Sequence, residues 1–192
     1  MKTNYAILYS SVASLVAVAI LVAFAISGSP GTYDSTHDFI NDVGQLGNTD
    51  DVTRTVEVRI RDNVFQPEKI IIEQGETVRF NISNDGVFVH EFYIGSPKMH
   101  SIRQKETAMM VERGMIELGG INYGMMDMDM NGRQIMRHYD TNGVLLEPGD
   151  STEIIWQFGR ESILEYACNL PGYYDSGMVG TFGFSSTATK TN

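Results

Sequence analysis

The chain has 192 residues, of which 42% are apolar and 20% are charged. This is the composition of a folded globular protein, and the length accommodates one domain with a hydrophobic core plus appended segments. The formal net charge of −10 argues against nucleic acid as a partner, because binding it needs a basic surface that neutralises phosphates. The single cysteine, Cys168, forms no intrachain disulfide, so it is either a buried small side chain or a reactive or metal-ligating thiol.

The N-terminal segment is predicted to be a membrane anchor or a signal peptide, spanning residues 1–28. Residues 6–26 carry no charged side chain, and about 20 apolar residues cross a bilayer core as a helix. Ala23 and Ala25 also fit the small-residue positions of a signal-peptidase site, although the apolar run is longer than a typical signal core. Either interpretation places the domain on the periplasmic or extracytoplasmic side. Residues 29–51 are predicted to be a spacer.

The following segments alternate between apolar and polar residues, as half-buried strands do. In residues 53–62, for example, Val56, Val58 and Ile60 alternate with charged side chains. Short segments of this kind, separated by turn residues and with no helix between them, predict an antiparallel β-sandwich or barrel over residues 52–185. The predicted strands lie within residues 53–62, 68–74, 75–86, 88–95, 144–158, 162–168 and 178–185.

Residues 96–140 form a predicted insertion with little alternation, and residues 186–192 a Ser/Thr-rich tail. A segment this long without a strand pattern is typically functional or disordered. Methionine side chains serve either as soft metal ligands or as an adaptable apolar contact surface, and both interpretations remain open. The insertion contains most of the eleven methionines: Met109, Met110, Met115, Met125, Met126, Met128, Met130 and Met136.

A candidate metal-binding loop lies near the C-terminus, where "CNLPGYYDSGM" begins at Cys168 and ends at Met178. A thiolate and a thioether at the two ends of a Gly- and Pro-containing loop are ligands for a soft metal. A blue-copper site combines two imidazoles, one thiolate and a weak axial thioether, and His90 in the predicted strand 88–95 supplies one imidazole.

Together, "NDGVFVHEFYIG" and "EYACNLPGYYDSGMVGTFGF" resemble the cupredoxins, the plastocyanin and azurin group, and in particular bacterial copper-binding members. The resemblance covers residues 55–185. It implies an all-β Greek-key sandwich that binds copper through His90, Cys168 and Met178.

Tyr173 departs from the family pattern, which has a histidine at this position of the loop. An unperturbed phenol has a pKa of about 10 and must lose its proton before it ligates a metal. Three outcomes follow: Tyr173 binds as a phenolate, copper is held by the other three ligands alone, or the site is empty. His100 and His138, on either side of the methionine-rich region, are alternative sources of an imidazole.

Two functions follow from these interpretations. The first is a membrane-tethered cupredoxin that binds one copper ion for electron transfer or copper trafficking, with a membrane-associated redox or copper-handling protein as its partner. The alternative is a metal-free interaction subunit of a membrane complex. An enzyme is not expected, because no recognisable motif supplies a catalytic acid, base or second metal.

Overall fold

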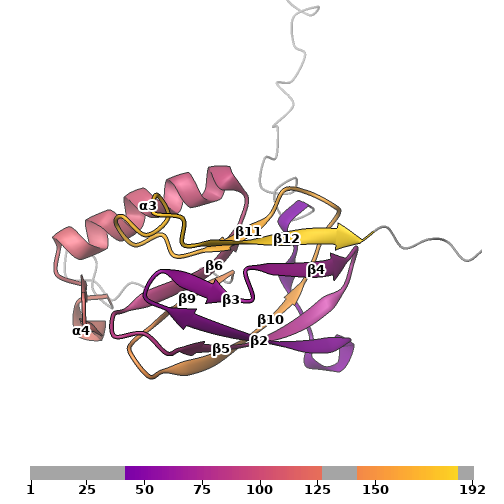
Figure 1. The fold of residues 1–192 in the computed structure, drawn as a ribbon, viewed down its shortest axis with the longest axis horizontal. Coiled ribbons are helices and arrows are strands. Elements are labelled where there is room, and N and C mark those ends of the chain that lie inside the picture. Colours follow the sequence, from indigo (N-terminus) through magenta and orange to yellow (C-terminus); the bar gives the residue numbers. More distant parts are fainter. Residues whose placement is uncertain (1–41, 127–141, 186–192) are drawn as a thin grey trace, which may run out of the picture. The chain divides into compact units, whose positions relative to one another are not determined.

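The computed structural model describes residues 42–126 and 142–185 (Figure 1). Several predictions fall outside these ranges: the anchor or signal peptide, most of the spacer, the tail, His138, and Met128, Met130 and Met136. Within the described ranges, no helix is both long enough and apolar enough to cross a membrane.

The domain consists mainly of two five-stranded sheets, and all of their strands except β1 and β3 fall within the predicted strand segments to within one residue. The first sheet has the order β1 (Gln45–Leu46), β10 (Ser151–Gln157), β5 (Thr77–Asn84), β2 (Arg54–Arg61) and β3 (Val64–Gln66). The second has the order β4 (Lys69–Glu73), β12 (Val179–Ser185), β11 (Glu165–Ala167), β6 (His90–Gly95) and β9 (Gly143–Leu146). The remaining elements are the short pair β7 (Ile116–Glu117) and β8 (Gly120–Ile121), the 3-10 turn η1 (Thr49–Asp51), and the helices α3 (Pro97–Glu112) and α4 (Tyr123–Met126).

The two sheets pack face to face through aromatic side chains. Phe80 of the first sheet lies 5.8 Å from Phe92 and 6.1 Å from Phe182 of the second, measured between ring centroids. Phe65 of the first sheet meets Tyr166 of the second edge to face, at 5.4 Å. Alternate residues along each strand supply this shared core, because side chains alternate between the two faces of a sheet. The sandwich predicted from the alternation is therefore confirmed.

The prediction that all strands pair antiparallel is wrong for two pairs. β2 pairs parallel with β5, and β4 pairs parallel with β12. The chain passes from β3 in the first sheet to β4 in the second and then returns to the first sheet with β5, which becomes the parallel neighbour of β2. Turn residues mark where a strand ends, but they do not specify which sheet the next strand joins.

The domain begins earlier than the predicted boundary at residue 52. β1 pairs with β10, Val43 is buried, and the indole Nε1 of Trp156 donates to the carbonyl of Val43 at 3.1 Å. These contacts make the last part of the predicted spacer an edge of the first sheet.

Helix α3 occupies the first part of the predicted insertion, and the expectation that this region lacks a helix is wrong. Ser96 caps its N-terminus by accepting a hydrogen bond from the backbone nitrogen of Met99, and Pro97 occupies the first turn. α3 contacts β6, and Figure 1 shows it alongside the second sheet. Its buried residues, His100 and Thr107, are polar. The helix therefore has no apolar stripe in its sequence, which is the usual signal for a helix.

Candidate metal centre

Three neighbouring strands bring His90, Cys168 and Met178 to the same end of the second sheet, where β6 and β12 begin and β11 finishes. β11 lies between β6 and β12 and pairs antiparallel with both. His90 begins β6, Cys168 directly follows β11, and Met178 directly precedes β12. The backbone nitrogen of Cys168 donates to the carbonyl of Met178 at 3.3 Å, which extends the pairing of β11 with β12. All three side chains are fully buried.

The imidazole of His90 presents one nitrogen to Cys168. Its Nδ1 atom lies 3.9 Å from the Sγ atom of Cys168, and its Nε2 atom lies 3.4 Å from Oδ1 of Asp62. Because a carboxylate only accepts hydrogen bonds, the contact with Asp62 places the proton on Nε2 and leaves the Nδ1 lone pair facing the sulfur. Burial lowers the pKa of His90, and the contact with Asp62 only partly opposes this. The neutral ring is the form that ligates metals.

The thiol of Cys168 is held in its protonated form when no cation is present. Burial raises its pKa to about 12, and the charge of Glu91 adds to this effect. The backbone nitrogen of Glu91 donates to Sγ at 3.4 Å and acts in the opposite direction. A thiol ligates a metal as the thiolate, so binding at this position releases a proton.

Two glycines shape the loop between Cys168 and Met178. Gly172 and Gly177 have φ angles of 87° and 92°, in the left-handed region that residues with a Cβ rarely adopt. The backbone nitrogen of Met178 donates to the carbonyl of Tyr173 at 3.0 Å. These turns reverse the direction of the loop, so that Met178 lies next to Cys168 at the same end of the second sheet.

The two consecutive tyrosines of the loop each contact a histidine. Tyr173 meets His90 edge to face, with ring centroids 5.0 Å apart and an interplanar angle of 78°. Burial raises the pKa of Tyr173, and the negative charge of the Asp62 carboxylate raises it further. Tyr174 stacks on His100 at 5.4 Å and donates its hydroxyl to Glu165 at 2.7 Å. The neutral phenol of Tyr173 is therefore favoured in the metal-free protein.

His100 contacts the loop from the side opposite Cys168. Its Nδ1 atom lies 3.0 Å from Oδ1 of Asn169, and its ring meets Tyr93 edge to face at 5.5 Å. Tyr93 and Phe92 are consecutive residues of β6 whose side chains point to opposite faces, and Phe92 is the one that enters the core. Among the described residues the Nε2 atom of His100 has no hydrogen-bond partner. The structure thus pairs this candidate imidazole with Asn169, on the outer face of the sheet.

The motifs in the sequence do not point to the residues that surround this centre, namely Asp62, Glu91, Arg103 and Asn169. Glu91 is fully buried and lies between the two candidate ligand segments. A charged residue directly after a candidate histidine ligand, in a strand with buried neighbours, was the available signal. No group of three or more His, Cys, Asp or Glu side chains suited to a metal exists in the part of the chain that the structure describes.

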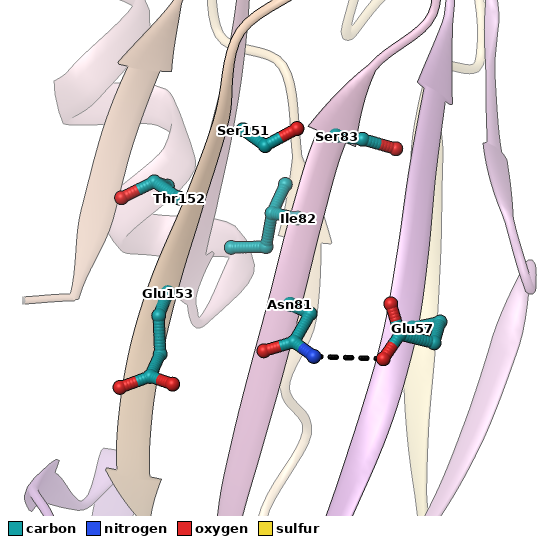
Figure 2. A pocket seen from close by; sticks show the side chains of 7 residues that line it. All are labelled: Glu57, Asn81, Ile82, Ser83, Ser151, Thr152 and Glu153. Atoms are coloured by element: carbon teal, nitrogen blue, oxygen red, sulfur yellow. Dashed lines mark hydrogen bonds between the residues drawn. The ribbon is translucent and has the colours of Figure 1, made fainter.

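A separate shallow pocket lies on the first sheet, between β2, β5 and β10 (Figure 2). Polar side chains dominate its lining, and Asn81 donates to Glu57 at 2.7 Å across it. None of the candidate metal ligands lines this pocket.

A sandwich of two sheets with histidine, cysteine and methionine at the same end of one sheet has the architecture of a cupredoxin. Auracyanin B shares this fold with a TM-score of 0.52 and 17% sequence identity, over 76% of this chain and 97% of auracyanin B. At that identity the comparison establishes the cupredoxin-like fold alone.

The chain belongs to the CopI family of cuproproteins. It is 38% identical over 176 residues to the copper-resistant cuproprotein CopI of Pseudomonas aeruginosa, and the matched region covers 88% of this chain and 92% of that protein. It is 31% identical over 154 residues to the copper-resistant cuproprotein CopI of Rubrivivax gelatinosus, over 80% of this chain and 79% of that one. No family model matches the chain.

Proposed function

We propose that this protein is an extracytoplasmic copper-binding protein that holds one copper ion between His90, Cys168 and Met178. The observation that carries the proposal is the distance of 3.9 Å between His90 Nδ1 and Cys168 Sγ. Both side chains are fully buried, and so is Met178 at the same end of the second sheet. The names of the CopI relatives, copper-resistant cuproproteins, support copper as the metal.

The donor set fits copper. One imidazole nitrogen, one thiolate and one thioether form a soft set, and sulfur ligands select Cu(I). Tyr173 supplies no second imidazole, and a phenolate oxygen is a harder ligand than the thiolate and thioether that suit Cu(I). Three-coordinate Cu(I) is therefore the state that the described residues suit best, which favours copper trafficking over electron transfer as the role.

We also propose that the protein is tethered to the membrane and delivers copper to, or receives it from, a membrane-associated protein; we propose no enzymatic activity. The support is the uncharged apolar segment at residues 6–26 and the net charge of −10, which favours a partner with a basic docking face. Detection of the full-length protein in washed membranes, and its release after deletion of residues 1–28, tests the tether. Recovery of the intact protein in the soluble fraction contradicts it.

Metal analysis of the full-length protein, purified in detergent, tests the copper site. We expect about one copper per chain in the wild type and almost none in Cys168→Ala. Met178→Leu should weaken binding, whereas the control Met99→Leu, which alters a methionine packed on the core outside the loop, should not. Tight Cu(I) binding without a visible band supports trafficking, whereas an intense thiolate-to-copper band supports electron transfer. A stoichiometry near zero in the wild type refutes the proposal.

One observation favours a second function, a metal-free interaction subunit: the position of the family's second histidine holds Tyr173, which packs on His90 as an aromatic contact. Tyr173→His distinguishes the two functions. If only this variant binds copper, the wild-type domain is a scaffold; if both bind copper, the metal-free function is excluded.

A further inference from the structure

Helix α3 directs a row of polar side chains onto the outer face of the second sheet, where they meet residues that neighbour the candidate ligands in the sequence. His100, Arg103 and Thr107 follow a spacing of three and then four residues, which places them on one face of the helix. His100 and Thr107 are fully buried, and only 12% of the Arg103 side chain is exposed.

These side chains contact two residues of the second sheet, Glu91 and Asn169. Nε of Arg103 donates to Oε1 of Glu91 at 2.7 Å. His100 contacts the side chain of Asn169, and Thr107 donates to its backbone carbonyl. The other carboxylate oxygen of Glu91 accepts from the backbone nitrogen of Asn169 at 3.2 Å and from its Nδ2 at 2.8 Å. The buried carboxylate is therefore paired with a cation and fully hydrogen-bonded.

Glu91 and Asn169 directly follow the candidate ligands His90 and Cys168 in the sequence. The ion pair between Glu91 and Arg103 consequently lies beside the segments that carry the candidate ligands, in a region that is largely shielded from solvent. Charges in such a region interact more strongly than they do at the surface. A Cu(II) site carries one more positive charge than a Cu(I) site, so a nearby carboxylate favours Cu(II) and a nearby guanidinium favours Cu(I).

We propose that Arg103 of α3 sets the oxidation-state preference of the copper site by neutralising the buried carboxylate of Glu91. This inference rests on the proposed function. Arg103 is a positioning and charge-balancing residue that acts through Glu91 and does not touch the metal. In its second carboxylate partner, Glu106, the Oε2 atom lies 3.2 Å from Nη1 of Arg103 and the side chain is 46% exposed, so solvent screens its charge.

The test measures the ratio of Cu(I) to Cu(II) affinity in the full-length protein, by competition with chelators selective for each state. Arg103→Gln should lower the ratio by about tenfold and Glu91→Gln should raise it by about tenfold, which for one electron corresponds to shifts of about 59 mV in opposite directions. The double variant, the charge-conserving Arg103→Lys and the control Glu106→Gln should all stay close to the wild type.

The signs of the shifts separate charge balance from a merely structural role. Shifts of both single variants in the same direction, or no shift in either, overturn the inference. Apo-protein circular dichroism identifies a variant that fails to fold. If Arg103→Gln does not fold, the Cu(I)-to-Cu(II) affinity ratios of Glu91→Gln and of the double variant decide. A ratio that is raised in Glu91→Gln and close to the wild type in the double variant supports the inference. Equal ratios in Glu91→Gln and the double variant overturn it. Wild-type protein without copper refutes the proposed function as well, whereas wild-type copper binding with no shift refutes this inference alone.

Discussion

The ring of Tyr173 stands edge-on to the imidazole of His90, with ring centroids 5.0 Å apart and planes at 78°. In the cupredoxin loop pattern that the sequence resembles, a second histidine ligand is expected at this position. Tyr173 instead places a neutral phenol beside the imidazole of His90, because burial and the nearby negative charge of Asp62 raise the pKa of Tyr173.

Tyr173→His should therefore restore a second imidazole. We expect Cu(II) to bind at least about tenfold more tightly, and a thiolate-to-copper band to appear or intensify, because two imidazoles and a thiolate suit both oxidation states. Chelator competition and visible absorption check this. Tyr174→Phe, which changes the neighbouring ring that stacks on His100, is the control and should leave the spectrum unchanged. Equal Cu(II) affinity in Tyr173→His and the wild type would show that position 173 does not face the metal.

Asp62 should contribute to metal affinity without touching the metal. Its carboxylate contacts Nε2 of His90 and holds the ring with Nδ1 facing Cys168. Loss of such a partner typically weakens metal binding about 10–100-fold, and we expect this for Asp62→Ala. Asp85→Ala removes an exposed carboxylate that forms a 4.0 Å ion pair with Arg59, and it should have little effect. Chelator competition on both variants measures the difference, and equal affinities would argue against the role of Asp62.

Arg103→Gln should destabilise the metal-free protein by about 3–5 kcal/mol, because it leaves the buried carboxylate of Glu91 without its cation. Arg160→Gln is the matched control. Arg160 also pairs with a carboxylate, Asp42, but both side chains are more than half exposed, so the loss should be below about 1 kcal/mol. Denaturant unfolding of the apo proteins gives both values. A loss in Arg103→Gln no larger than in Arg160→Gln would mean that Glu91 is adequately solvated.

The apo protein should lose stability at high pH through Cys168. Its pKa is raised to about 12 in the folded state from an ordinary value of 9.0, so the folded protein retains this proton more strongly than the unfolded chain does. This contribution is present below about pH 9 and decreases as the pH rises toward 12, by at most about 4 kcal/mol. Comparing unfolding free energies at pH 8 and pH 11 in the wild type and Cys168→Ala isolates the effect. The variant should lose less stability than the wild type, and parallel losses would contradict the burial argument.

Alternation of apolar residues was sufficient to predict most strands, because most of them have one face on the shared core and one toward solvent; β6, which is buried along its whole length, is an exception. Val58 and Ile60 of β2 are buried as their spacing predicted. The pattern was not sufficient for α3, whose buried face carries His100 and Thr107 in place of an apolar stripe. Nor did it predict β1, a two-residue strand too short to display a period.

The sequence by itself determined the chemistry available at the candidate centre: one imidazole, one thiol and one thioether, with a phenol at the loop position where the cupredoxin resemblance predicts a second imidazole. Only the tertiary structure decided which of these groups meet and what surrounds them. His90 and Cys168 are 78 residues apart in the chain and become neighbours through the pairing of β6 with β11. The ion pair of Glu91 and Arg103 likewise requires α3 to pack against β6. Local patterns report how a residue is oriented within its own element, whereas the distance between two elements depends on how the whole core packs.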